Sequence, residues 1–160
     1  MKFQKLTIKN IASIENAEIN FDAEPLSNSG IFLITGKTGS GKSTILDCIC
    51  LALYGITPRL KSTNIQGVTI DLDKEVSVND PRVLMRRNTS ESYVCLTFIG
   101  NDENSYQAEW SCRRANGKID GKLQDKKRCL TNLTKNFTYS KLDEIVPEIK
   151  RIIGLDFEQF

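Results

Sequence analysis

The 160-residue chain contains no histidine. A nuclease or hydrolase centre that binds its metal through His and Asp ligands therefore cannot lie wholly within these residues. The five cysteines show no C-x-x-C spacing, and their odd number argues against a framework of disulfides. Two of them, Cys48 and Cys50, lie in a strongly apolar stretch, where we expect them to be buried as small hydrophobic residues.

Long apolar runs are also missing. No stretch approaches the roughly 18 apolar residues of a membrane-spanning helix, and Met1–Lys5 lacks the apolar core of a secretory signal. We therefore expect a cytoplasmic protein with no membrane partner. The 22 basic and 20 acidic side chains nearly cancel, so a nucleic-acid surface would have to come from local clustering of charge. The length suits one domain with one core.

One glycine-rich stretch, Gly36–Ser43, fits the pattern G-x-x-x-x-G-K-[ST] of a phosphate-binding loop. The apolar run ahead of it predicts a buried strand over residues 31–35. The apolar stretch Ser43–Tyr54 behind it predicts a helix that is buried on nearly all sides. Residues 31–54 would then form the strand–loop–helix unit that this motif requires.

The residue types in the loop suit a nucleoside triphosphate. Glycines allow positive φ and a close approach of phosphate, and the amides at the start of the helix present partial positive charge to an anion. Lys42 would stabilise charge on the β- and γ-phosphates, the Ser43 hydroxyl suits Mg²⁺, and Thr44 could contact the α-phosphate. The predicted ligands are ATP and Mg²⁺, and the predicted binding residues are Gly36, Lys37, Thr38, Gly39, Ser40, Gly41, Lys42, Ser43 and Thr44.

Binding a nucleotide does not imply hydrolysing it. A P-loop NTPase also needs an acidic residue after a second buried strand and a group that orients the attacking water. The nearest acidic candidates, Asp71 and Asp73, lack a preceding apolar run, so we do not expect them to fill that role. The sequence thus contains half of a catalytic site.

The rest of the chain indicates strands and one further helix. Residues 2–9 and 17–21 alternate between apolar and polar side chains and predict a hairpin, whereas residues 59–82 show no period and predict a long surface connection. Residues 93–133 predict an antiparallel hairpin followed by a short strand. A possible capping box, Ser140-x-x-Asp143, precedes a helix predicted over residues 141–153. We therefore predict an α/β fold, a P-loop NTPase with an antiparallel β-sheet subdomain.

Basic residues gather in two places. Positive charge on one face is sufficient to contact a phosphate backbone, but such clusters are also common in ordinary solvated loops, and the sequence leaves both interpretations open. One cluster is Arg82, Arg86 and Arg87, and the other lies between Arg113 and Arg128. The possible DNA-backbone contacts are Arg86, Arg87, Arg113, Arg114, Lys118, Lys122, Lys126, Lys127 and Arg128.

With these residues in view, the chain resembles the N-terminal part of the SbcC family. These are ABC-type, SMC-like ATPases that work with a nuclease partner in DNA break processing. The two segments Leu51–Tyr54 and Thr57–Leu60 are more specific for this family than the P-loop itself, which other ABC ATPases share. The other motifs that carry the resemblance are Leu6–Ile11, Leu46-Asp47, Leu84-Met85 with Arg87, Gln107–Trp110, and Gly154–Phe157 with Phe160.

The resemblance implies the N-terminal lobe of a split ATPase head. The glutamine-bearing loop, the ABC signature, the second acidic motif and the switch histidine would lie beyond residue 160, in a C-terminal lobe. Two heads would enclose two ATP molecules, and their closure would regulate an SbcD-type metal-dependent nuclease acting on double-stranded DNA in the bacterial nucleoid. The isolated N-terminal lobe would be inactive.

In one respect the sequence departs from the family pattern. Family members often place a basic or polar residue in the first β-turn, within reach of the nucleotide, whereas this chain has Ala12; Lys9 or Ser13 could substitute for it. Two alternative functions stay open. One is the head of another SMC-like or ABC ATPase, and the other is a nucleotide-gated DNA clamp that does not hydrolyse ATP.

Overall fold

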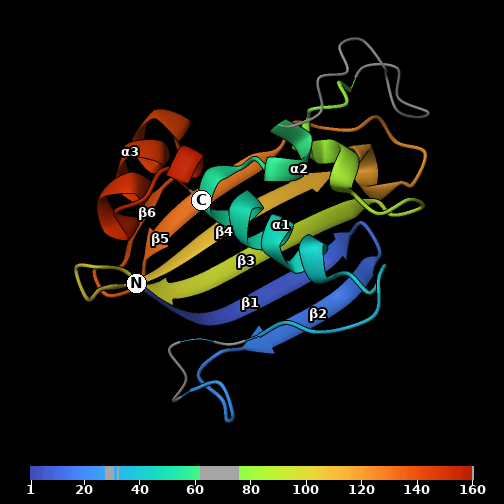
Figure 1. Cartoon of the computed structure of the whole chain (residues 1–160). Coiled ribbons are helices and arrows are strands. Elements are labelled where there is room, and N and C mark those ends of the chain that lie inside the picture. The colour runs from blue at the N-terminus through green and yellow to red at the C-terminus, as the bar shows by residue number, and fades with distance from the viewer. Residues whose placement is uncertain (28–30, 32, 62–75, 160) are drawn as a thin grey trace.

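A computed structural model describes residues 1–27, 31, 33–61 and 76–159 (Figure 1). Its centre is a six-stranded sheet with strand order β2-β1-β3-β4-β5-β6, in which every neighbouring pair is antiparallel. The strands are β1 (Lys2–Ile11), β2 (Ile14–Asn20), β3 (Glu91–Ile99), β4 (Ser105–Arg113), β5 (Lys127–Asn132) and β6 (Phe137–Tyr139).

Helix α1 (Lys42–Tyr54) crosses one face of the sheet and packs on β1, β3 and β4, while α3 (Leu142–Ile153) packs beside it on β5 (Figure 1). The shorter helices are α2 (Pro58–Lys61) and the 3₁₀ turns η1 (Pro81–Leu84), η2 (Ala115–Gly117) and η3 (Phe157–Gln159). Within the described part of the chain, no helix has the length and apolar character needed to cross a bilayer.

The core lies between the sheet and these helices. Along β4, alternate side chains from Tyr106 to Cys112 are buried, as the period of two predicts. Helix α1 is buried over most of its length, and Cys48 and Cys50 are both buried, which confirms the sequence prediction. The largest fully buried side chains of the sheet are Leu6, Ile8, Ile11, Leu96, Phe98, Tyr106, Trp110 and Leu130.

The two predicted hairpins belong to one sheet. The first is β1 with β2 and the second is β3 with β4, and β1 pairs directly with β3, with Leu6 opposite Leu96 and Ile8 opposite Val94. The predicted short strand is present as β5, and β6 completes that edge. The antiparallel region is therefore continuous with the layer on which α1 packs.

The predicted buried strand over residues 31–35 is wrong. Ile31 and Leu33 are 89% and 85% exposed, and neither lies in a strand. An extended segment becomes a stable strand when a neighbour pairs with its backbone. The six-stranded sheet does not include this segment, so these two apolar side chains face solvent in the described part of the chain.

The predicted capping box is also wrong, although α3 itself is present. Its N-cap residue is Lys141, with no side-chain cap, and Asp143 and Glu144 instead place negative charge in the first turn. The helix ends at Ile153, as predicted, and its C-cap residue Gly154 has a φ of 78°. Of the predicted surface connection 59–82, residues 62–75 lie outside the described residues, and Asp71 and Asp73 lie among them.

Candidate nucleotide-binding site

The loop before α1 has the backbone geometry that the motif predicts. Gly39 and Gly41 lie in the left-handed region, with φ values of 83° and 91°. Gly41 is the N-cap of α1, where no side chain caps the helix and no acidic residue lies in the first turn. The first amides of α1 therefore have no anionic side chain from these positions, which is the arrangement that binds a phosphate.

Lys42 is folded across this loop. Its ammonium donates hydrogen bonds to the carbonyl oxygens of Gly36 and Lys37, at 2.7 and 2.8 Å. These contacts hold the ammonium group against the loop backbone, at the N-terminal end of α1. Residues 35–40 and Ser43 are exposed, whereas Thr44 is buried with 6% of its surface accessible. Most of the loop and Ser43 are thus accessible to a ligand.

The turn between β1 and β2 lies against the loop. A Cβ atom placed on Gly41 would lie 3.6 Å from the Ile14 side chain and 3.7 Å from the Ser13 hydroxyl, which is ordinary van der Waals contact. Of the two residues that could replace a basic group at Ala12, Lys9 is paired with Glu91 at 2.6 Å, whereas Ser13 is beside the loop. Proximity to the loop therefore favours Ser13 over Lys9 as the residue that replaces the basic group.

The opposite end of α1 is completed by the protein itself. Gly55 has a φ of 73°, and its N–H donates to the carbonyl oxygens of Cys50 and Leu51. The Arg128 guanidinium, from β5, donates to the Leu53 carbonyl at 2.7 Å. Burial lowers the pKa of Arg128 to about 10. Arg128 therefore supplies a cation at the negative end of the helix and does not project as a DNA contact.

Asp47 links α1 to the segment that follows it. The carboxyl group is buried, its ion-pair partner is Arg59 and it accepts a hydrogen bond from Thr57. Burial raises the pKa of Asp47 above its usual value, against the opposing effects of Arg59 and Thr57. Two of the motifs that carry the family resemblance are thus in contact, which gives a physical reason for their joint occurrence.

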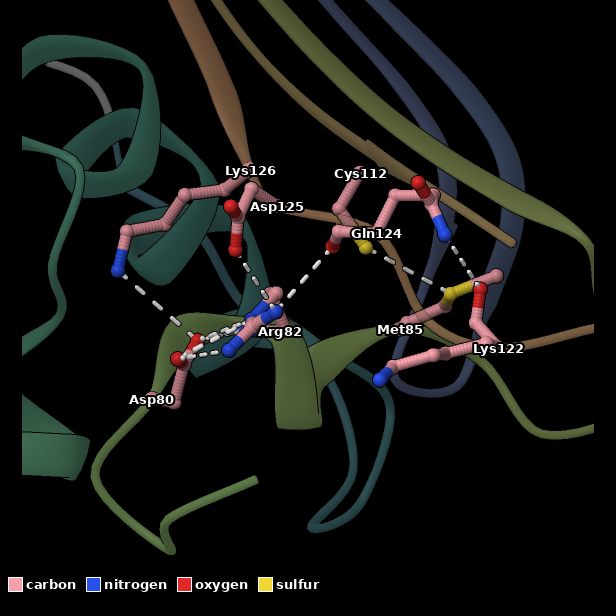
Figure 2. A network of polar contacts seen from close by, with 8 residues as sticks. All are labelled: Asp80, Arg82, Met85, Cys112, Lys122, Gln124, Asp125 and Lys126. Atoms are coloured by element: carbon pink, nitrogen blue, oxygen red, sulfur yellow. Dashed lines mark hydrogen bonds and ion pairs between the residues drawn. The ribbon is translucent and has the colours of Figure 1, made fainter. Parts of the chain in front are cut away.

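Part of the basic cluster is neutralised within the fold (Figure 2). The Arg82 guanidinium contacts the Asp80 carboxylate at 2.8 Å, the Asp125 carboxylate at 3.4 Å and the Gln124 carbonyl at 3.3 Å, and Lys126 lies 3.9 Å from Asp80. Burial raises the pKa of Asp80, but hydrogen bonds from Arg82 and the charge of Lys126 hold it below its usual value. Arg82 and Lys126 are therefore engaged with carboxylates.

The other predicted DNA contacts divide by their surroundings. Arg86 donates to the Ser13 carbonyl at 2.7 Å and Arg114 to the Gly121 carbonyl at 3.2 Å, so both side chains turn toward backbone. Lys126 stays exposed although it lies near Asp80, and the other exposed members of the set are Arg87, Arg113, Lys118, Lys122 and Lys127.

Sequence reasoning missed the roles of Arg82 and Arg128, although signals for both exist. Asp80-Pro81-Arg82 is a typical 3₁₀ or helix start, and Asp80 does cap η1. The alternation of β5 places Arg128 opposite the buried Trp110. Among the described residues, no group of three or more His, Cys, Asp or Glu side chains is placed to hold a metal ion.

Comparison with known proteins agrees with this geometry. Residues 5–160 match the family model described as AAA domain. The chain belongs to this family. The SbcC component of the SbcCD nuclease from Pseudomonas aeruginosa is 42% identical over 163 residues, covering 100% of this chain and 14% of that protein. The Rad50 ATPase of Archaeoglobus fulgidus, named for DNA double-strand break repair, is 30% identical over 113 residues, covering 67% of this chain and 12% of that protein.

The fold is also found in a solved structure. The solved structure of the recombination mediator RecF with ATP superposes with a TM-score of 0.57 at 17% identity, covering 91% of this chain and 29% of that one. The predicted P-loop ATPase fold and the resemblance to SbcC are both confirmed. The chain corresponds to the N-terminal ATPase region of SbcC and spans about one seventh of the length of such relatives, 14% in P. aeruginosa.

Proposed function

We propose that this chain is the ATP-binding lobe of an SbcC-like ATPase of DNA double-strand-break repair. The observation that carries the proposal is the N-terminal end of α1, where an uncapped helix, two left-handed glycines and the Lys42 ammonium converge. In this arrangement Lys42 would bind the β- and γ-phosphates, and Ser43 would hold Mg²⁺. The cation, when bound, neutralises charge on the phosphates.

The lobe would form one wall of a composite site. Ile31 and Leu33, directly before the loop, expose apolar side chains that suit burial against further strands. We propose that the protein's own C-terminal lobe covers this segment, and that a second head closes over the nucleotide. The loop residues would then bind and orient ATP, and hydrolysis would need groups from both additional parts.

The partners follow from the relatives. Because proteins similar to this chain are named as the SbcC component of the SbcCD nuclease, we propose an SbcD-type metal-dependent nuclease as partner. Double-stranded DNA is the proposed substrate of the assembly, in the bacterial cytoplasm. The exposed basic residues Arg87, Arg113, Lys118, Lys122 and Lys127 are the proposed contacts to its phosphate backbone.

Turnover tests the composite site. The 160-residue chain is expected to bind Mg-ATP weakly and to hydrolyse it negligibly, whereas the full-length protein hydrolyses it in steady state. Steady-state phosphate release by both proteins, each with its Lys42→Ala variant as control, makes this comparison. Rapid turnover by the short chain would contradict the composite site. A lack of turnover by the full-length protein, with and without DNA, would favour the non-hydrolysing clamp.

The DNA surface is tested by salt dependence. Replacing Lys118, Lys122 and Lys127 with alanine is expected to weaken duplex binding by the full-length protein and to reduce the slope of log K against log salt by up to about 3. The matched control removes the same number of charges from another part of the molecule, at Lys135, Lys141 and Lys150. Equal slopes of log K against log salt in the two triple variants would indicate that these lysines belong to an ordinary solvated loop.

A further inference from the structure

The β1–β2 turn has a strained backbone. Asn10 and Ala12 lie in the left-handed region, with φ values of 54° and 48°. Asparagine tolerates this conformation, but the Cβ of alanine makes it unfavourable. A turn that contains such an alanine keeps its shape when neighbouring groups hold it in place.

The neighbouring groups come from the last residue of η1 and the segment that follows it. The Ala12 N–H donates to the Leu84 carbonyl at 2.7 Å, and the Arg86 N–H donates to the Asn10 carbonyl at 2.9 Å. The Arg86 guanidinium then donates to the Ser13 carbonyl at 2.7 Å. Main-chain bonds thus hold the start of the turn, and a side chain holds its last residue, the one that faces the nucleotide-binding loop.

The segment that carries Arg86 is itself fixed at both sides. Met85 bridges to Ile11, and the Thr89 hydroxyl donates to the Arg86 carbonyl at 2.7 Å. Upstream, Arg82 is bound by Asp80 and Asp125 (Figure 2). A guanidinium on a fixed backbone can hold the group it binds in a defined position.

The other side of the turn contacts the N-cap of α1. Ser13 and Ile14 form a wall beside Gly41, at van der Waals distance from the place of a Cβ atom. Gly41 directs the first amides of the helix, since its backbone joins the loop to Lys42. The order of contact is therefore Arg86, Ser13, Gly41, and then the amides that would bind phosphate.

We infer that Arg86 is a positioning residue of the nucleotide site, which holds Ser13 and the β1–β2 turn against Gly41. The inference rests on the proposed ATP-binding function. It replaces the DNA-backbone contact predicted for Arg86 from sequence, because the guanidinium is directed at a carbonyl beside the loop. It also explains how the β1–β2 turn stays beside the loop although position 12 is alanine and not a basic residue.

The test uses the full-length protein and its Arg86→Met, Arg86→Lys and Lys135→Met variants. Calorimetric titration with Mg-ATP, at a temperature well below unfolding, is expected to show a dissociation constant raised about 5-fold or more in Arg86→Met, in the range of ordinary couplings between contacting groups. Arg86→Lys should recover most of the affinity, because an ammonium still donates to the Ser13 carbonyl. Lys135→Met, which removes an exposed charge in the β5–β6 turn, should match the wild type.

Three results would overturn the inference. One is an unchanged affinity in Arg86→Met, with thermal stability alone reduced, which indicates a purely structural role. Another is an unchanged affinity for Mg-ATP together with a reduced salt slope for duplex DNA, which indicates a DNA contact. A third is an Arg86→Lys variant as weak as Arg86→Met. If the wild type itself binds no Mg-ATP, the proposed function fails, and the inference fails with it.

Discussion

The two ends of α1 are built in opposite ways. At the C-terminal end, Gly55 closes the helix with its own N–H, and Arg128 from a distant strand binds the Leu53 carbonyl. At the N-terminal end, Gly41 offers no side chain, no acidic residue follows in the first turn, and Lys42 adds positive charge.

The difference separates stability from binding. Helix ends leave backbone groups without partners inside the helix, and a protein satisfies them with its own groups or leaves them for a ligand. The buried end of α1 takes the first solution and the exposed end takes the second. Substitutions at the two ends should therefore affect different measurements.

The largest expected effect is at the buried end. Gly55→Ala should destabilise the fold by about 2–4 kcal/mol, because alanine is strained in the left-handed region and its Cβ would meet the Arg128 side chain. That Cβ would lie 2.7 Å from Arg128 Cδ. Urea denaturation of the wild type and the variant measures the difference in the free energy of unfolding.

Gly117→Ala is the matched control for this substitution. Gly117 has a similar φ, 65°, but a Cβ there would have no neighbour within 4 Å. Its cost should be about 1–2 kcal/mol, the backbone strain alone. Equal costs at the two glycines would contradict the close contact with Arg128 and the distinction it supports.

Local signals predicted α1 and its loop well. The motif places its glycines and Lys42, and Gly55 ends the helix, so the proposed nucleotide site depends on residues that are near one another in the sequence. The alternation in β4 likewise reports its own buried face. These features were predictable because the relevant interactions are local.

Features that depend on distant partners were not predictable. The apolar run from Ile31 indicates a segment suited to burial, but periodicity does not reveal whether a strand is present to pair with it. The pairing of β1 with β3 joins residues more than eighty positions apart. Counting charges in the basic cluster gave no information on which arginines meet carboxylates or carbonyls, as Arg82, Arg86 and Arg128 do.

The exposed end of α1 gives the most direct test of the account. Isothermal titration of the full-length protein with Mg-ATP should show binding, and Lys42→Ala should weaken it by about 1.5–3 kcal/mol, the cost of losing charge-assisted hydrogen bonds to phosphate. The free energy of unfolding should stay nearly unchanged, because Lys42 contacts carbonyls of an exposed loop. Equal affinity of wild type and variant would contradict the assignment of this helix end as the nucleotide site.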